Sequence, residues 1–213
     1  MTGLRGVIFD CDGVLFESHR ANLAFYNAVL DYFGEAPVRP EETARAHLCH
    51  TAASPRVLET LLGNERAAAG LAYAASLDYR QFIPFMTPEP GLQPSLAQLA
   101  KTLPLAVATN RGRSVRAVLK HFALEDFFSV VVTSKDVAAP KPSPDMLLLA
   151  LQQLKLAAAE VLFVGDSELD QAAARAAGIR FVAYKGMIEG DYAVHGHREL
   201  VTLLQGAGVV RAS

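Results

Sequence analysis

Two carboxylates separated by a single residue follow the first apolar run of the chain. Residues 7–9 are Val-Ile-Phe, and Asp10, Cys11, Asp12 and Gly13 come directly after them. Residues i and i+2 of an extended segment point to the same side, so the negative charges of the two carboxylates repel each other. Such a pair needs a cation, or a reaction that uses both groups.

Polar side chains also follow three of the later apolar runs. They are Thr109 with Asn110, Lys141 in a proline-rich loop, and Asp166 with Asp170. In an open α/β sheet, ligands bind beyond the carboxyl ends of the strands. If the sheet is parallel, these groups therefore meet at one edge. Hard cations such as Mg²⁺ prefer a few carboxylates together with the phosphate oxygens of a substrate.

The elements that must position these residues alternate along most of the chain. Five runs that are apolar along nearly all of their length predict buried parallel strands, at residues 7–9, 105–108, 130–132, 161–164 and 180–183. A helical pattern precedes each of the last four, at residues 93–101, 114–122, 143–154 and 169–177. This alternation predicts an α/β fold, a Rossmann-like parallel sheet of about five strands flanked by helices.

The long segment between the first two strands breaks this rhythm. Helical periodicity fills it, with predicted helices beginning near residue 23 and covering residues 45–62 and 65–85, and it contains no convincing strand. We therefore predict an α-helical cap domain of residues 17–88, inserted into an α/β core of residues 1–16 and 89–213. Residues 196–213 predict little beyond a short helix.

Composition narrows the class of protein. The chain has 213 residues, of which 51% are hydrophobic and 20% charged, and its net charge is −2. This balance argues against a partner that is a nucleic acid or an anionic membrane. Two cysteines indicate no disulfide framework, the first residues do not resemble a signal peptide, and no apolar run approaches the ~20 residues of a membrane helix. We expect a cytoplasmic protein, either a monomer or a homodimer.

Taken in order, the four polar segments resemble the four motifs of the haloacid dehalogenase-like superfamily. The chain carries Asp10-x-Asp12-Gly13, a strand-ending Thr109, Lys141 before a helix, and Gly165-Asp166-Ser167 followed by Asp170. A helical insertion after the first motif is similar to the subgroup that contains phosphoglycolate phosphatase-like and β-phosphoglucomutase-like enzymes. The resemblance covers the chain from about residue 6 to about residue 194.

The resemblance implies a role for each motif residue. Asp10 would be the nucleophile that forms an aspartyl-phosphate, and Asp12 the general acid and base. Thr109 and the backbone N–H of Asn110 would bind phosphoryl oxygens, while Lys141 would stabilise their charge. Mg²⁺ would be held by Asp10, the carbonyl of Asp12 and Asp166, with Asp170 orienting the ligands.

The substrate implied is a small phosphorylated metabolite, similar to phosphoglycolate or a sugar phosphate. No sequence rule identifies the residues that contact its leaving group. We take Arg20 and Arg45 as candidate substrate-binding residues, because a cation in the cap could meet an anionic group. Arg39, Arg56 and His47 are further candidates, and all five equally fit an exposed surface. His195 and His197 lie outside the motifs and are expected at the surface.

Several other interpretations compete with phosphate ester hydrolysis. A calcium loop would need Glu twelve positions on from Asp10, where the chain has Ala21; a purely structural pair of aspartates is also conceivable. Asp12 argues against the dehalogenase branch, and the absence of any lysine before Lys101 excludes the Schiff base of the phosphonatase branch. A mutase that returns the phosphoryl group to a sugar stays open, although Thr109-Asn110 favours hydrolysis. A non-catalytic binding module on the same fold stays open as well.

Overall fold

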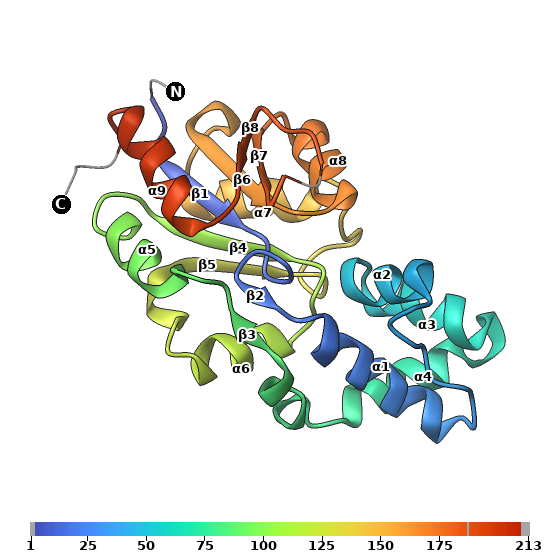
Figure 1. Cartoon of the computed structure of the whole chain (residues 1–213). Helices are drawn as coiled ribbons and strands as arrows, with labels where there is room; N and C mark the ends of the chain where they lie inside the picture. The colour runs from blue at the N-terminus through green and yellow to red at the C-terminus, as the bar shows by residue number, and fades with distance from the viewer. Residues whose placement is uncertain (1–2, 187, 210–213) are drawn as a thin grey trace.

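The computed structural model describes residues 3–186 and 188–209, and its centre is a parallel sheet (Figure 1). The sheet has six strands in the order β5-β4-β1-β6-β7-β8, and every neighbouring pair is parallel. Their bounds are β1 Gly6–Phe9, β4 Leu105–Thr109, β5 Phe128–Thr133, β6 Val161–Gly165, β7 Arg180–Tyr184 and β8 Tyr192–Val194. The carboxyl ends of β1, β4 and β6 therefore lie side by side at one edge.

Helices cover both faces of this sheet. Side chains that alternate along β1 enter two separate cores: Val7 and Phe9 pack in one, and Ile8 packs in the other. The first core contains residues of α5 (Leu92–Leu99), α6 (Ser114–His121) and α9 (His197–Gly206), and the second contains residues of α7 (Asp145–Leu154) and α8 (Glu168–Ala177). Burial on both faces explains why the strands read as continuous apolar runs.

The structure confirms the α/β class and all five predicted strands, and it adds a sixth, β8. This strand pairs only with β7 and has three residues, Tyr192–Val194, of which Ala193 is exposed. A short strand at the edge of a sheet is covered on fewer sides than a central one. It therefore lacks the continuous apolar run by which the other strands were predicted.

Four α-helices fill residues 18–86 of the long segment that follows β1: α1 His19–Tyr32, α2 Thr43–Thr51, α3 Ser54–Leu62 and α4 Asn64–Ser76. The prediction of one helix over residues 45–62 was wrong, because the chain is extended at Ala52 and Ala53. Pro55, in the first turn of α3, has no N–H for a bond to the preceding turn, so it starts a new helix instead of continuing α2. The helix predicted over residues 65–85 is confirmed as far as Ser76, the end of α4, and two short 3₁₀ turns, Tyr79–Gln81 and Ile83–Phe85, replace its last part.

Two short strands join the helices to the sheet. β2 (Phe16–Glu17) pairs antiparallel with β3 (Thr87–Pro88), so both connectors cross at the same place. The prediction of no strand between residues 10 and 104 missed this pair. We call residues 18–86, between the two connectors, the helical insertion; its treatment as a cap domain of residues 17–88 stays a prediction. Among the residues that the structure describes, no helix has both the length and the apolar character needed to cross a bilayer.

His197, expected at the surface, is fully buried at the start of α9. Its Nε2 lies 2.8 Å from the carbonyl oxygen of Val14, in the turn that leads from Asp12 to β2. Burial lowers the pKa of His197 from 6.5 to about 4, although the Val14 carbonyl favours the charged form. The ring is therefore neutral near pH 7, with Nε2–H donating to Val14. A lone histidine outside any motif gives no signal for this contact.

Replacing His197 should change how stability depends on pH. The pKa of the buried ring lies below its unfolded value, so the unfolded chain binds the extra proton between pH 6.5 and 4. His197→Gln keeps an N–H that can reach Val14 and removes this titration. Urea unfolding of both proteins should therefore show an advantage of wild type at pH 7.5 that shrinks by up to about 1.4 kcal/mol per pH unit below pH 6.5. A constant difference across that range would contradict the buried, neutral ring.

Candidate active site

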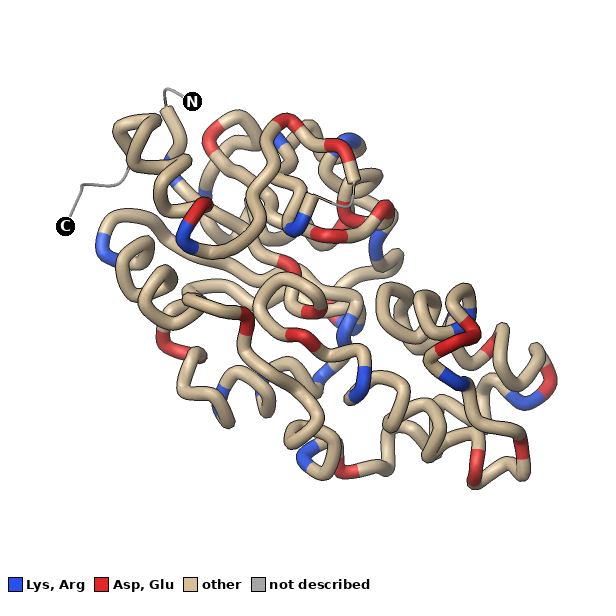
Figure 2. Tube along the Cα trace, viewed as in Figure 1, with Lys and Arg blue, Asp and Glu red and all other residues tan. Residues whose placement is uncertain are grey.

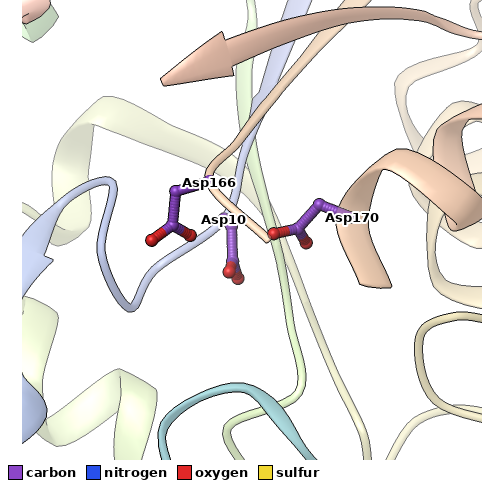
Figure 3. A group of neighbouring side chains, drawn as sticks. All are labelled: Asp10, Asp166 and Asp170. Atoms are coloured by element: carbon purple, nitrogen blue, oxygen red, sulfur yellow. The ribbon is translucent and has the colours of Figure 1, made fainter. Parts of the chain in front are cut away.

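Three aspartates converge at the carboxyl edge of the sheet (Figure 3). Asp10 directly follows β1, Asp166 follows β6, and Asp170 lies in the first turn of α8. One carboxylate oxygen of each lies within 4.8 Å of the others. Asp10 and Asp170 are buried and Asp166 is half-buried. The parallel sheet thus brings together three residues that are 160 positions apart at the extremes, as its topology predicts.

We call Asp10, Asp166 and Asp170 the aspartate cluster. Its negative charges are not fully balanced by nearby positive charge. Burial, and next the charge of Asp170, raise the pKa of Asp10 from 3.8 to about 7, and the same two causes raise that of Asp166 to about 8. Carboxylates in this state gain from a nearby cation. Three converging carboxylates are also the donor set that Mg²⁺ prefers, so these residues fit a bound Mg²⁺.

Asp166 offers the most accessible oxygens of the three. Its carboxylate accepts no hydrogen bond from residues 3–186 or 188–209. Gly13, at φ +79°, lets the backbone pass so close that a Cβ there would lie 1.9 Å from Asp166 Oδ2. The glycine of the first motif therefore makes room for the carboxylate of the fourth.

Lys141 is the buried cation of the cluster. Its Nζ lies 2.8 Å from Asp10 Oδ1 and 2.5 Å from Asp170 Oδ1. Burial alone would lower the pKa of Lys141, but Asp10 and Asp170 raise it above its ordinary value, so the side chain stays charged. The other oxygen of Asp170 accepts hydrogen bonds from the backbone N–H and hydroxyl of Ser167. Both oxygens of Asp170 are thus occupied, and its part is to fix Lys141 and the start of α8.

Asp12 belongs to a different set of contacts. Its carboxylate accepts a 3.0 Å hydrogen bond from Nε of Arg111 and a second from Nη2, and it also accepts from the hydroxyl of Ser18 and from Asn22 Nδ2. Burial would raise the pKa of Asp12, but the charge and hydrogen bonds of Arg111 outweigh it and lower the pKa to about 2. Two aspartates that are two residues apart thus have opposite shifts: Asp10 is poised to lose its charge, and Asp12 holds it.

Thr109 and Asn110 lie at the end of β4, beside the cluster. The Thr109 hydroxyl accepts from the backbone N–H of Arg111, which leaves its own hydrogen to donate. Asn110 Nδ2 donates to the carbonyl oxygens of Lys141 and of Thr51 in α2, at 3.1 and 2.9 Å. Asn110 therefore links the core of the site to the helical insertion.

The structure does not bring Arg20 and Arg45 to the site. Arg20 is exposed on α1, with its guanidinium carbon 5.9 Å from the centroid of the Phe85 ring. Arg45 forms an ion pair with Glu42, one turn earlier, at 2.7 Å. Neither side chain lines the cavity beside Asp12. Their role in binding substrate stays a prediction.

Sequence reasoning missed the residues that surround Asp12. Arg111 is buried, contacts Asp12, donates to Asn22 Oδ1 at 2.8 Å, and lies 4.8 Å over the ring of Tyr79. His50, whose pKa burial lowers to about 4, lies 3.2 Å from Asn22 Nδ2. An arginine directly after Thr109-Asn110 was the available signal. Figure 2 shows the acidic and basic positions that meet near the centre of the molecule.

Fold and site together define a class of protein. It is an α/β enzyme that gathers carboxylates and a buried lysine at the carboxyl edge of a parallel sheet, beneath helices inserted after the first strand.

Comparison with known proteins gives the family. The model of the haloacid dehalogenase-like hydrolases matches residues 7–184. The chain is 35% identical over 200 residues to a phosphoglycolate phosphatase of Pectobacterium atrosepticum, which covers 85% of this chain and 80% of that one. It is 36% identical over 198 residues to a phosphoglycolate phosphatase of Yersinia pestis, with 82% and 78% covered. This chain belongs to the haloacid dehalogenase-like hydrolase family.

A solved structure agrees with this assignment. A hydrolase of the same superfamily from Geobacter sulfurreducens, of subfamily IA, variant 1, superposes with a TM-score of 0.83. It is 38% identical, and the match covers 94% of this chain and 100% of that one. The likeness therefore extends over the helical insertion as well as the sheet.

Proposed function

We propose that this chain is a Mg²⁺-dependent phosphatase that hydrolyses a small phosphorylated metabolite through an aspartyl-phosphate on Asp10. The observation that carries the proposal is the contact of Asp10 with Lys141, 2.8 Å apart, inside the aspartate cluster. A carboxylate with raised pKa beside a fixed cation is arranged to accept a phosphoryl group, whose charge Lys141 offsets. The phosphoglycolate phosphatases that this chain resembles support the same reaction class.

Asp10 and Asp166 would hold the Mg²⁺, with Asp170 behind them and the carbonyl of Asp12 as a further ligand. When bound, the cation supplies charge neutralisation between the nucleophilic carboxylate and the phosphate group. The chain's own part is then positioning. Lys141 fixes one oxygen of Asp10, and Thr109 has a hydroxyl hydrogen to donate to a phosphoryl oxygen.

The reaction needs two proton movements, and Asp12 would serve both. In the first half, Asp10 forms a bond to phosphorus while the bond to the leaving oxygen breaks, and that oxygen takes a proton. In the second half, water loses a proton to Asp12 as its oxygen bonds to phosphorus, and the bond between Asp10 and phosphorus breaks, which releases inorganic phosphate and regenerates the Asp10 carboxylate. Arg111 holds Asp12 as a carboxylate, which suits the second step. The first step requires Arg111 to move off Asp12 so that the carboxyl group can carry a proton.

The second candidate, a β-phosphoglucomutase-like phosphotransferase, has less support. In that branch of the family a cap histidine stands about where this chain has Asn22. Here the amide of Asn22 bonds to Asp12 and Arg111 and cannot exchange a proton. The cytoplasmic location and the assembly as a monomer or homodimer both stay predictions. Both cysteines, Cys11 and Cys49, are free and buried.

Phosphate release across a panel of phosphorylated metabolites tests the proposal. We expect release of inorganic phosphate that requires Mg²⁺ and stops on chelation, without conversion of a sugar phosphate to its isomer. Isomer formation without phosphate release would favour the mutase. No release from any phosphomonoester in the presence of Mg²⁺ would favour the non-catalytic binding module.

A further inference from the structure

A cavity of about 610 Å³ lies beside Asp12, between the core and the helical insertion. Asp12 and Asn110 line it and Asp10 does not, while many of its other lining residues belong to the helical insertion, so the cavity extends from Asp12 toward the insertion. At about 30 Å³ for each water-sized group, the space holds on the order of twenty such groups. A glycolate leaving group, with a two-carbon skeleton, would fill a small part of it.

The helical insertion touches the core around this cavity. Asn110 Nδ2 donates to the carbonyl of Thr51 at 2.9 Å, and His47 Nε2 lies 2.8 Å from Glu168 Oε1. Arg111 adds its contacts with Asn22 and Tyr79. The space therefore remains when insertion and core are in contact.

The wall supplied by the helical insertion is largely apolar. Its apolar side chains come from α1, from α4 and from the turn after α4: Phe25, Tyr26, Leu71, Ala74, Ala75 and Leu77. Polar groups of the insertion, from Asn22, His50 and Ser54, line another part of the cavity. Small polar molecules gain little from such a wall, whereas an aliphatic or aromatic group placed there loses contact with water. This wall favours a leaving group with an apolar body.

The wall supplied by the core is positively charged. Arg111, Arg113 and Lys135 all line the cavity, and Asp12 is its one carboxylate among the described residues. Arg111 is paired with Asp12, but Arg113 and Lys135 form no ion pair within residues 3–186 and 188–209. His50 is neutral near pH 7, since burial lowers its pKa to about 4. Two unpaired cations are thus left to meet an anion carried by the occupant.

We propose that the leaving group of the substrate is larger than glycolate, with an apolar body against α4 and an anionic group, such as a carboxylate, near Arg113 and Lys135. This inference rests on the proposed phosphatase function, and names the substrate class of the same site. The substrate is a phosphate monoester of an apolar alcohol or phenol that carries a second negative charge beyond its apolar part.

Three probe substrates separate size from charge. 4-Carboxyphenyl phosphate has the ring and the anion, phenyl phosphate has the ring alone, and 2-phosphoglycolate has an anion without an apolar body. Wild type should show a kcat/KM for 4-carboxyphenyl phosphate at least about tenfold above that for phenyl phosphate. The double variant Arg113→Gln/Lys135→Gln should reduce this preference to less than about threefold, because kcat/KM for 4-carboxyphenyl phosphate falls more than that for phenyl phosphate.

A second variant tests the apolar wall. Ala75 is exposed to the cavity from α4, so Ala75→Leu narrows the space without overfilling a core. It should lower kcat/KM for 4-carboxyphenyl phosphate about tenfold, a size effect typical of apolar pockets, and leave 2-phosphoglycolate within about twofold. The matched control, Ala68→Leu, changes an exposed residue of the same helix outside the cavity and should change neither rate.

The outcomes distinguish this inference from the function on which it rests. Hydrolysis of 2-phosphoglycolate at least as efficient as that of 4-carboxyphenyl phosphate, with no effect of Ala75→Leu, overturns the inference and leaves the phosphatase intact. Equal preference for the charged and uncharged rings in wild type overturns the anionic part. No Mg²⁺-dependent phosphate release from any of the three probes, or from the wider metabolite panel, counts against the phosphatase itself.

Discussion

Asp10→Asn is expected to lower Mg²⁺-dependent phosphate release at least about a thousandfold, because the amide cannot attack phosphorus and no other carboxylate replaces it. Asp12 is held by Arg111, and both oxygens of Asp170 are occupied. Acid quenching during turnover should leave phosphate bound to the wild-type chain and none on the variant. Labelled phosphate on the Asp10→Asn protein would identify a different nucleophile.

The same substitution should not weaken the fold, which makes the loss of activity interpretable. Burial and the charge of Asp170 raise the pKa of Asp10 to about 7 in the folded state. The folded protein therefore binds this proton more tightly than the unfolded chain does, and it loses stability as pH rises from 3.8 through 7. An asparagine carries no charge to desolvate. In metal-free buffer at pH 8, the variant should therefore unfold at the same temperature as wild type or higher. Asp31→Asn, on the exposed face of α1, serves as the matched control and should change neither property.

The parts of the molecule that were predictable from sequence share one physical cause. Strands buried on both faces, such as β1 and β6, must be apolar along their whole length. Polar residues at their ends then stand out, and parallel topology brings those ends together. This is why the aspartate cluster could be assembled from residues as far apart as Asp10 and Asp170.

The contacts that escaped prediction depend on side chains meeting across the two parts of the chain. Arg111 and Asn22 are 89 residues apart, and no periodicity relates a loop of the core to a helix of the insertion. His197 is 183 residues from Val14. Such pairings follow from how the insertion and α9 settle on the sheet, which sequence patterns do not encode. They also decide the shape and charge of the cavity, so substrate choice was the least predictable property.

Lys141→Met is expected to lower both kcat and the free energy of unfolding. The loss of unfolding free energy should depend on pH. Removing the ammonium group takes away the charge that faces the phosphoryl group, a loss on the order of 10²–10³ in kcat for one stabilising group of this kind. It also leaves Asp10, Asp166 and Asp170 together without their buried cation, and breaking a buried ion pair costs roughly 3–5 kcal/mol of unfolding free energy.

The pH dependence identifies that second effect. Lys141 lowers the raised pKa values of Asp10 and Asp166, so without it both carboxyl groups have still higher pKa values in the folded state than in the unfolded chain. Stability is therefore retained below about pH 4 and lost as pH rises. The deficit of Lys141→Met in urea unfolding should therefore be larger at pH 8 than at pH 5. Lys101→Met, at an exposed turn after α5, should show no deficit at either pH.

Added Mg²⁺ should recover part of the stability of Lys141→Met at pH 8, because a divalent cation can offset the charge of the same carboxylates. The kcat of the variant should stay low, because the ammonium group beside Asp10 is still missing. A deficit independent of both pH and Mg²⁺ would mean that Lys141 contributes packing and not charge.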